Sequence, residues 1–225
     1  MKLAIIADIH SNIHALEAVA RELENIDHDL VLCAGDIVGY GANPNECCGR
    51  VRDLADLAVF GNHELAALTG DVIWMNPHAA KAAVWTSKTL TQESREFLRE
   101  LELEARLDAD GKPCAMYHGS VRSAIQYVYE DQLDLGMLES AECDILILGH
   151  THIPYAVRFA RGVAINPGSV GQPRDGDPRA SFAVLDTNSL QCDIMRVDYD
   201  TEAAWEAIVE AGLPDYLGER LLVGR

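Results

Sequence analysis

The stretch Leu3–His10, with the sequence LAIIADIH, passes from a short apolar run, Leu3–Ala7, directly into an Asp-x-His pair. Such a run, ended by polar groups, is typical of a buried β-strand. Between Leu16 and Leu23, apolar residues recur at i, i+3, i+4 and i+7, which predicts one buried face of a helix. A second run of strand length, Leu30–Ala34, then ends in Gly35-Asp36. The order strand, helix, strand indicates an α/β sheet.

Three more apolar runs of strand length lie further along the chain, at Leu57–Phe60, Cys114–Tyr117 and Ile145–Leu148. The stretch Asn43–Glu46 predicts the start of a helix between the second and third runs, because Asn43 can cap it and Pro44 suits its first position. This alternation of strands and helices predicts a sheet that is at least partly parallel.

Two later regions have a different pattern. Residues 64–107 are mostly helical in pattern and are a candidate cap or lid over a site. After Ile153 we expect short strands joined by hairpins, forming a second sheet layer: Ala156–Phe159, Val163–Asn166, Ser181–Leu185 and Cys192–Val197. A last helix is expected from Thr201 to about Gly212. We find no repeat or linker and expect a single domain over residues 1–225.

Composition excludes several classes of partner. The 225 residues include 18 Lys and Arg against 36 Asp and Glu, a net charge of −18. Such a surface repels duplex nucleic acid and anionic membranes, so we expect neither as a partner. No apolar run approaches the roughly 18–20 residues that span a bilayer, and Asp8 comes too soon for a signal-peptide core. The six cysteines form no CxxC pair and are interpreted as reduced thiols of a cytoplasmic protein.

Polar residues of types that bind metals come directly after five of the expected strands. They are Asp8, His10, Asp36, Asn62, His63, His118, His150 and His152. Ligands of open α/β sheets bind at the carboxyl ends of the strands, so we expect these eight side chains to lie in one crevice. Residues i and i+2 of a strand point to the same side, so Asp8 with His10, and His150 with His152, could each chelate an ion.

Each of these residues alone has a simpler interpretation. A histidine after a strand is more often a hydrogen-bonded loop residue, and Gly35-Asp36 by itself is usually a turn. Five loops with such residues at the same relative position favour a metal site instead. Imidazole, carboxylate and amide groups are ligands of first-row divalent ions, and the lack of thiolates argues against structural zinc. The set is too large for one catalytic ion but suits two ions about 3.5–4 Å apart that share a carboxylate.

The chain resembles the calcineurin-like metallophosphoesterase superfamily in five blocks: Asp8-x-His10, Gly35-Asp36, Gly61-Asn62-His63-Glu64, His118 and Gly149-His150-Thr151-His152. The strings Asp8–Asn12 and Asn166–Gly171 look like those of its small bacterial and archaeal phosphodiesterase-type branch. The matched blocks run in order from Asp8 to about Arg174. The resemblance implies an α/β fold of four layers, an α-β-β-α sandwich with two mixed sheets flanked by helices.

The resemblance also implies a ligand set for two divalent metal ions. Asp8, His10 and His152 would hold one ion, Asn62, His118 and His150 would hold the other, and Asp36 would bridge them. His63 would stay off the metals, beside the phosphoryl group. Glu64 stands where many relatives carry Asp, and it could orient His63. The ions could be Mn, Fe, Zn, Ni or Co, because nitrogen and oxygen sites are filled largely by availability.

The activity implied is hydrolysis of phosphodiester or phosphomonoester bonds in small substrates such as nucleotides. A hydroxide bridging the ions would attack, Asp36 would hold the bridge, and His63 would act as general acid or donate to a phosphate oxygen. Asn12 and Arg174 are candidate substrate contacts, although a surface salt bridge is as good an interpretation of Arg174. Two alternatives remain open, a binding scaffold without turnover and a DNA nuclease, which the charge of −18 disfavours. The sequence leaves the oligomeric state open.

Overall fold

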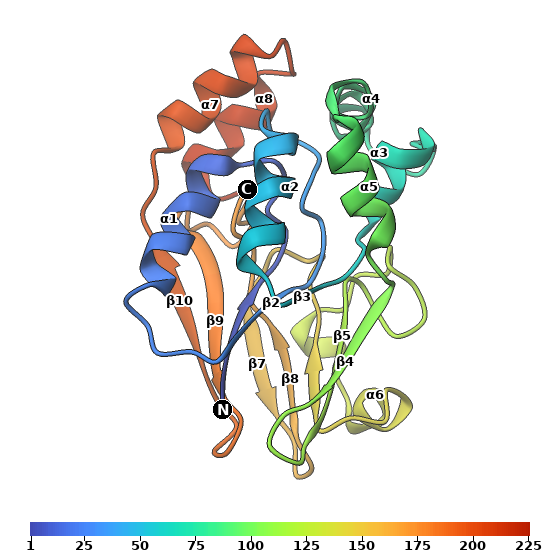
Figure 1. The fold of residues 1–225 in the computed structure, drawn as a ribbon, viewed down its shortest axis with the longest axis vertical. Coiled ribbons are helices and arrows are strands. Elements are labelled where there is room, and N and C mark those ends of the chain that lie inside the picture. The colour runs from blue at the N-terminus through green and yellow to red at the C-terminus, as the bar shows by residue number, and fades with distance from the viewer.

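Two five-stranded sheets form the centre of the computed structural model, which describes residues 1–225 (Figure 1). Sheet A contains β1 (Lys2–Ile6), β2 (Leu30–Cys33), β3 (Leu57–Ala58), β9 (Ala180–Asp186) and β10 (Gln191–Val197), in the order β10-β9-β1-β2-β3. Sheet B contains β4 (Glu104–Asp108), β5 (Pro113–Tyr117), β6 (Ile145–Ile147), β7 (Tyr155–Arg158) and β8 (Val163–Asn166), in the order β4-β5-β6-β8-β7. Both sheets are mixed: β1, β2 and β3 are parallel, as are β5, β6 and β8, while β4, β7, β9 and β10 join their sheets through antiparallel pairing.

Helices cover the outer faces of the two sheets (Figure 1). The helices are α1 (Ile13–Leu23), α2 (Pro44–Leu54), α3 (Asn62–Thr69), α4 (Pro77–Thr89), α5 (Gln92–Glu100), α6 (Leu135–Ser140), α7 (Thr201–Glu210) and α8 (Tyr216–Glu219), with 3-10 turns at Glu130–Gln132 and Arg220–Val223. Helices α1 and α2 pack on sheet A, and α6 packs on sheet B. The expected four-layer α-β-β-α sandwich is confirmed. Every helix is too short or too polar to cross a lipid bilayer.

The alternation of side chains along each strand builds the layers. In β1, Leu3 and Ile5 pack into the core between the two sheets, whereas Ala4 and Ile6 pack against the helices outside sheet A. In sheet B, Met116 belongs to the core between the sheets, and its neighbour Ala115 packs with α6. Because successive residues of a strand point to opposite faces, a run that is apolar throughout must be covered on both sides.

Two expectations about the order of elements are corrected. The segment 64–107 is helical only through α5, and its last residues form β4, where Ala105 and Leu107 alternate with exposed residues and contact the core between the sheets. The late strands do not form one layer, since β7 and β8 join sheet B while β9 and β10 complete sheet A. Because the sheets share one core, we propose that residues 1–225 form a single domain.

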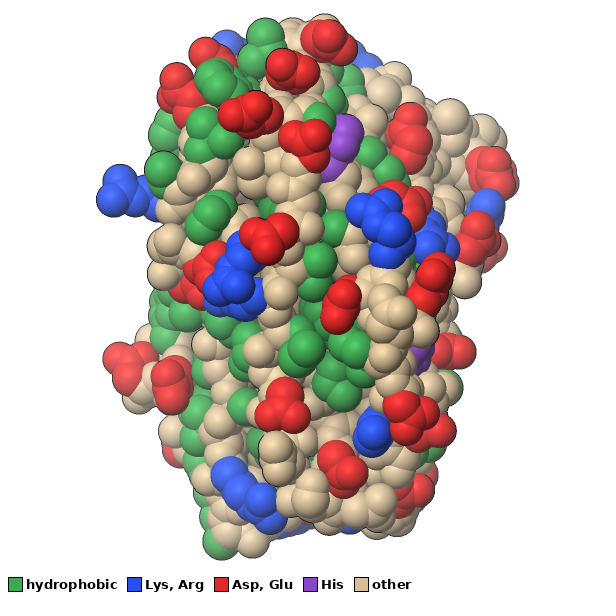
Figure 2. All heavy atoms as spheres, turned by 90° about the vertical axis from the view of Figure 1, so that its left-hand side faces the viewer, with side chains coloured by type: hydrophobic (Ala, Val, Ile, Leu, Met, Phe, Trp, Pro, Cys, Tyr) green, Lys and Arg blue, Asp and Glu red, His purple; other side chains and the backbone are tan.

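Charged side chains are distributed over the surface. Figure 2 shows the face formed by α1, α7 and β10, where carboxylates are spread across the view, several of them beside Lys or Arg. Ion pairs such as Arg50–Glu17 and Arg196–Asp175 are consistent with this picture. The six cysteines are unpaired, and five of them are buried, as for Cys33, whose thiol pKa burial raises to about 12.

Candidate metal centre

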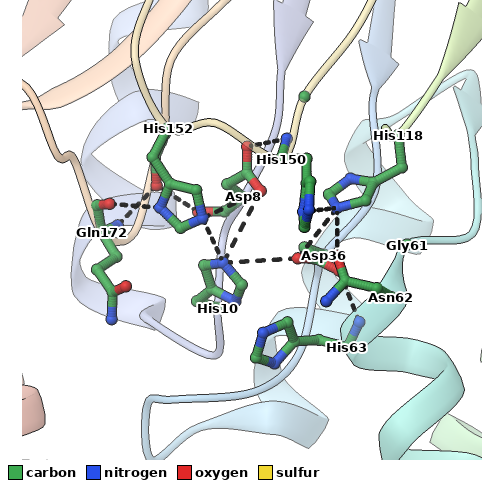
Figure 3. A network of polar contacts seen from close by, with 12 residues as sticks. Asp8, His10, Asp36, Gly61, Asn62, His63, His118, His150, His152 and Gln172 are labelled. Atoms are coloured by element: carbon green, nitrogen blue, oxygen red, sulfur yellow. Dashed lines mark hydrogen bonds and ion pairs between the residues drawn. The ribbon is translucent and has the colours of Figure 1, made fainter. Parts of the chain in front are cut away.

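The eight polar residues predicted from the strand ends lie together where strands of both sheets end (Figure 3). Asp8 and His10 follow β1, Asp36 follows β2, Asn62 and His63 begin α3 just after β3, His118 follows β5, and His150 and His152 follow β6. All eight are at most 5% exposed. The predicted crevice is therefore formed by two stacked sheets and not by one, because β5 and β6 pack behind sheet A.

The loops that carry these residues have an unusual backbone. Asp8, His10, Asp36, His150 and His152 all have φ between 49° and 67°, in the left-handed region that non-glycine residues rarely adopt. Hydrogen bonds from the Asp8 amide to the Gly35 carbonyl and from the His10 amide to the Asp36 carbonyl, both 3.0 Å long, hold two of the loops together. Backbone strain of this kind concentrates at functional sites, where the surrounding fold enforces it.

His10, His152 and Asp8 form the first group of side chains. The Nδ1–H of His10 donates to the Val38 carbonyl at 3.1 Å, and the Nδ1–H of His152 donates to the Gln172 carbonyl at 2.6 Å. Each ring therefore turns an unprotonated Nε2 to the other, and these two nitrogens are only 3.0 Å apart. Asp8 Oδ1, 3.4 Å from His152 Nε2, is buried and has no hydrogen-bond donor.

His118, His150, Asn62 and Asp36 form the second group. The Nδ1–H of His118 donates to the Ala34 carbonyl at 2.8 Å. Three acceptor atoms then converge on His118 Nε2: Asn62 Oδ1 at 3.0 Å, His150 Nδ1 at 3.2 Å and Asp36 Oδ2 at 3.1 Å. Even a protonated His118 has one Nε2–H to offer these three atoms.

Burial and neighbouring charges shift the pKa values of this cluster. Burial raises the pKa of Asp8 to about 8, and the nearby Asp36 carboxylate adds to that effect. Burial opposes ionisation of Asp36, but His118 and His63 nevertheless hold the Asp36 pKa well below its usual range. Burial also disfavours a charged His118, yet the Asp36 carboxylate raises the His118 pKa to about 10. Two buried carboxylates facing crowded imidazoles are a set of groups that cations would stabilise.

The donor set fits divalent ions. Asp8, His10 and His152 form one group with ligand atoms all within 4.8 Å of one another, and Asp36, His118 and His150 form another. Asp36 Oδ2 reaches both, lying 3.7 Å from His10 Nε2 and 3.1 Å from His118 Nε2. A cation in each group would satisfy the facing lone pairs and the unpartnered Asp8 oxygen.

The structure corrects one expectation about chelating pairs. Asp8 and His10 belong to one group, as their spacing predicts, but His150 and His152 belong to different groups. Both histidines have positive φ, so the alternation of an extended strand does not continue through Gly149–His152. His150 offers Nδ1 to the second group, while His152 offers Nε2 to the first.

His63 lies beside both groups, with its ring 4.7 Å from that of His10 and 4.6 Å from that of Tyr40 (Figure 3). His63 Nδ1 is buried without a partner and packs against Gly39, where a Cβ atom would lie 2.1 Å away. Gly39 also has φ of +91°, so both the lack of space for a Cβ atom and the backbone conformation favour glycine at position 39. Burial lowers the pKa of His63 to about 4. Because a buried N–H needs an acceptor, the neutral ring carries its proton on Nε2.

Glu64 does not orient His63, which corrects the role expected from the sequence. Its carboxylate is fully buried and accepts three backbone amides, from Asp36 at 3.0 Å, Val38 at 3.1 Å and Gly61 at 2.8 Å. Glu64 therefore fixes the loop that carries Asp36 to the first turn of α3. The sequence indicated a carboxylate at position 64. It did not indicate the three backbone amides that this carboxylate accepts, because only folding brings them together.

Glu64→Ala should lower the free energy of unfolding by about 3 kcal/mol or more, because it leaves three buried amides without an acceptor. Urea unfolding in EDTA measures this loss without any contribution from bound metal. Glu46→Ala, at an exposed carboxylate of α2, is the matched control and should change stability little. Equal stability of the two variants would show that Glu64 does not hold the loop.

A cavity of ≈180 Å³ opens beside the cluster. It is bordered by Asp36, Asn62, His63, His150 and His152 of the cluster and by Tyr40, Trp74, Met75, Asn76, Ala79, Ile125, Tyr127 and Arg174. The segment Trp74–Ala79 belongs to the helical region that was a candidate cap, and it forms one wall. The ring of Tyr40 packs on His63, and that of Tyr127 packs on His150. These two residues were not predicted from the sequence, because an isolated tyrosine in a loop forms no recognisable pattern.

Of the two residues expected to contact substrate, Arg174 borders the cavity, whereas Asn12 caps a helix. Asn12 is 5% exposed and caps α1, accepting from the Ala15 amide at 3.1 Å and donating to the Gly171 carbonyl at 2.9 Å. Its polar atoms are already paired, so the substrate role is replaced by a structural one. Arg174 borders the cavity and has no carboxylate within 4.0 Å, so the alternative of a surface salt bridge is wrong.

A family model for the calcineurin-like phosphoesterase superfamily domain matches residues 1–190. The chain belongs to the calcineurin-like phosphoesterase superfamily. The resemblance drawn from the five sequence blocks is thereby confirmed. Residues 191–225, which lie beyond the matched superfamily domain, contain β10, α7 and α8.

Relatives of this calcineurin-like chain extend over most of its length. An uncharacterized protein of Methanocaldococcus jannaschii is 38% identical over 242 residues, covering 99% of this chain and 98% of the relative. Phosphodiesterase YfcE of Escherichia coli is 26% identical over 200 residues, covering 84% of this chain and 90% of the relative. The crystal structure of a metallophosphoesterase from Sphaerobacter thermophilus is similar with a TM-score of 0.87, at 34% identity and with 100% of both chains covered.

Proposed function

We propose that this chain is a metal-dependent phosphoesterase that hydrolyses small phosphodiesters or phosphomonoesters with two divalent ions. One observation carries the proposal: Asp36 Oδ2 lies within reach of two groups of buried side chains, 3.7 Å from His10 Nε2 in one and 3.1 Å from His118 Nε2 in the other. The family, and the names phosphodiesterase and metallophosphoesterase given to two relatives, support the same class of reaction.

Asp8, His10 and His152 would hold one ion and Asn62, His118 and His150 the other, with Asp36 as the bridging ligand. Two bound divalent ions supply positive charge for the phosphate oxygens and lower the pKa of a coordinated water, so that a nucleophile is available near neutral pH. Asp8 and Asp36 carry −2 and two such ions +4, which leaves a local charge of about +2 beneath an acidic surface. The protein's −18 charge therefore does not oppose binding of a small phosphate ester.

His63 would donate a hydrogen bond from Nε2 to the substrate as the neutral ring, or a proton from Nε2 as the imidazolium, which an anionic substrate in the cavity would stabilise. Its Nδ1 is turned to Gly39, which leaves Nε2 as the ring nitrogen available to a ligand in the cavity. The contacts with Gly39, His10 and Tyr40 fix the ring plane. Donation to the leaving-group oxygen assists its departure, whereas donation to a phosphate oxygen stabilises charge.

Removal of metal should abolish hydrolysis and weaken phosphate binding. We expect the Mn²⁺-loaded protein to hydrolyse at least one of bis(p-nitrophenyl) phosphate, p-nitrophenyl phosphate, a cyclic nucleotide and a diadenosine polyphosphate. Chelation followed by desalting should remove that activity, and added Mn²⁺ should restore it. Calorimetry should show much weaker binding of orthophosphate to the metal-free protein, because the cluster then lacks the positive charge of the two ions.

The controls separate the enzyme from a binding scaffold of the same fold. A loaded protein that retains two ions per chain yet hydrolyses none of the four substrates would favour the scaffold. Equal phosphate affinity with and without metal would contradict the proposal that the ions supply the positive charge. Zn²⁺, Ni²⁺, Co²⁺ and Fe²⁺ in place of Mn²⁺ test which ion supports the highest rate.

A further inference from the structure

Two arginines that pair with no Asp or Glu side chain border the cavities beside the metal cluster. Arg174 borders both the cavity beside the cluster and a second one of ≈360 Å³, which Arg220 also borders. Neither guanidinium has a side-chain carboxylate within 4.0 Å, although the chain contains 36 Asp and Glu. Arg174 donates to Gln172 Oε1 at 2.8 Å, and Arg220 donates to the main-chain oxygen of Arg225, the last residue of the sequence.

The ring of Tyr40 lies near both guanidinium groups. Its ring centroid is 5.6 Å from Arg174 Cζ and 5.9 Å from Arg220 Cζ, and a second tyrosine, Tyr216, lies 5.7 Å from Arg220 Cζ. Burial lowers the pKa of Arg220, and the positive charge of Arg174 lowers it further. An anion would stabilise two like charges that act on each other in a partly buried position, and guanidinium groups match phosphate oxygens in geometry.

The second cavity adjoins the first. Both are bordered by Tyr40, Asn76, Tyr127 and Arg174, so a ligand bound at the cluster lies next to the cavity that Arg220 borders. Tyr40 also contacts His63, which places the arginine pair one aromatic ring away from the proposed proton donor. A charged extension of the substrate would therefore enter the second cavity along Arg174.

We propose that Arg174 and Arg220 form a second phosphate subsite and that the substrate carries a further phosphate group linked to the one being hydrolysed. This inference rests on the proposed function, because it places the reacting phosphate at the metal cluster. The substrate class is esters that contain a phosphoanhydride link, and an isolated phosphate ester would occupy the cluster alone. Specificity would then come from the C-terminal segment that carries Arg220 as well as from the metal residues.

The test is calorimetric titration of imidodiphosphate, which mimics two linked phosphates but is not hydrolysed at its P–N–P bridge, against orthophosphate. With Mn²⁺-loaded protein, we expect imidodiphosphate to bind one per chain and at least about tenfold tighter than orthophosphate. Arg220→Gln should reduce that ratio to near one, and Arg220→Lys should keep part of it. Arg179→Gln, which removes an exposed arginine paired with Asp177, should keep all of it.

Metal content measured after each titration shows that the probe has not removed the ions. A ratio near one in the unaltered protein, or two orthophosphates bound independently with no gain for imidodiphosphate, would overturn the linked subsite. A ratio unchanged in Arg220→Gln would overturn the role of Arg220. A tenfold ratio in a protein that hydrolyses no phosphate ester would support the subsite while refuting the proposed function.

Discussion

Asp36→Ala should leave the protein unable to retain two metal ions and without measurable phosphoesterase activity. Asp36 is the only carboxylate with an oxygen within 4.0 Å of the Nε2 atoms of both His10 and His118. Its loss removes the atom that the two groups share. We expect metal affinity to fall by more than the about 10–100-fold that follows loss of an outer-shell partner. Metal content after gel filtration and the rate of hydrolysis measure the two effects.

Two further variants make the Asp36 experiment specific. Asp36→Asn keeps an oxygen that can accept the His63 amide, as Oδ1 does now at 2.8 Å, so it tests the charge with the loop preserved. Asp27→Ala removes a carboxylate that is 89% exposed and should leave metal content unchanged. An Asp36→Ala protein that still holds two ions per chain would refute the bridge.

His63→Ala should retain both metal ions but lose about 10²–10⁴-fold in kcat, the range typical of a positioned proton donor. The ring of His63 lies beside the metal groups, and its Nδ1 has no partner to lose. The loss should grow as the leaving group becomes more basic, because a p-nitrophenolate departs without a proton and an alkoxide does not. Rates for a p-nitrophenyl ester and for an alkyl ester of the same phosphate measure this difference.

His28→Ala, at a partly buried histidine near the end of α1, is the matched control and should keep full activity. A uniform loss across leaving groups in His63→Ala would assign His63 to charge stabilisation on the phosphate. Unchanged kcat for both esters would refute either role. Loss of metal from this variant would show that His63 is itself a ligand, as its place in the group with His10 and Asp36 allows.

Much of the candidate site could be predicted because its residues follow strands directly. An apolar run marks a buried strand, and the first polar side chain after it must lie at the sheet edge, as for Asp8 after β1 and His118 after β5. A different expectation, that residues i and i+2 share one side, failed for His150 and His152, because positive φ breaks the strand alternation. Nearness in sequence to Asp8 and His10 was also a poor guide for Asn12, which caps a helix.

The sequence alone determined which strands are buried, which polar residues end them and to which family the chain belongs, because these depend on local periodicity and short motifs. Only the tertiary structure decided that the strand ends come from two stacked sheets and that carbonyls of Val38 and Gln172 set the protons of His10 and His152. It alone placed Glu64 on three amides and Arg220 near Arg174. These contacts join residues as many as 46 positions apart, and only packing of the folded chain brings such groups within hydrogen-bonding or electrostatic range.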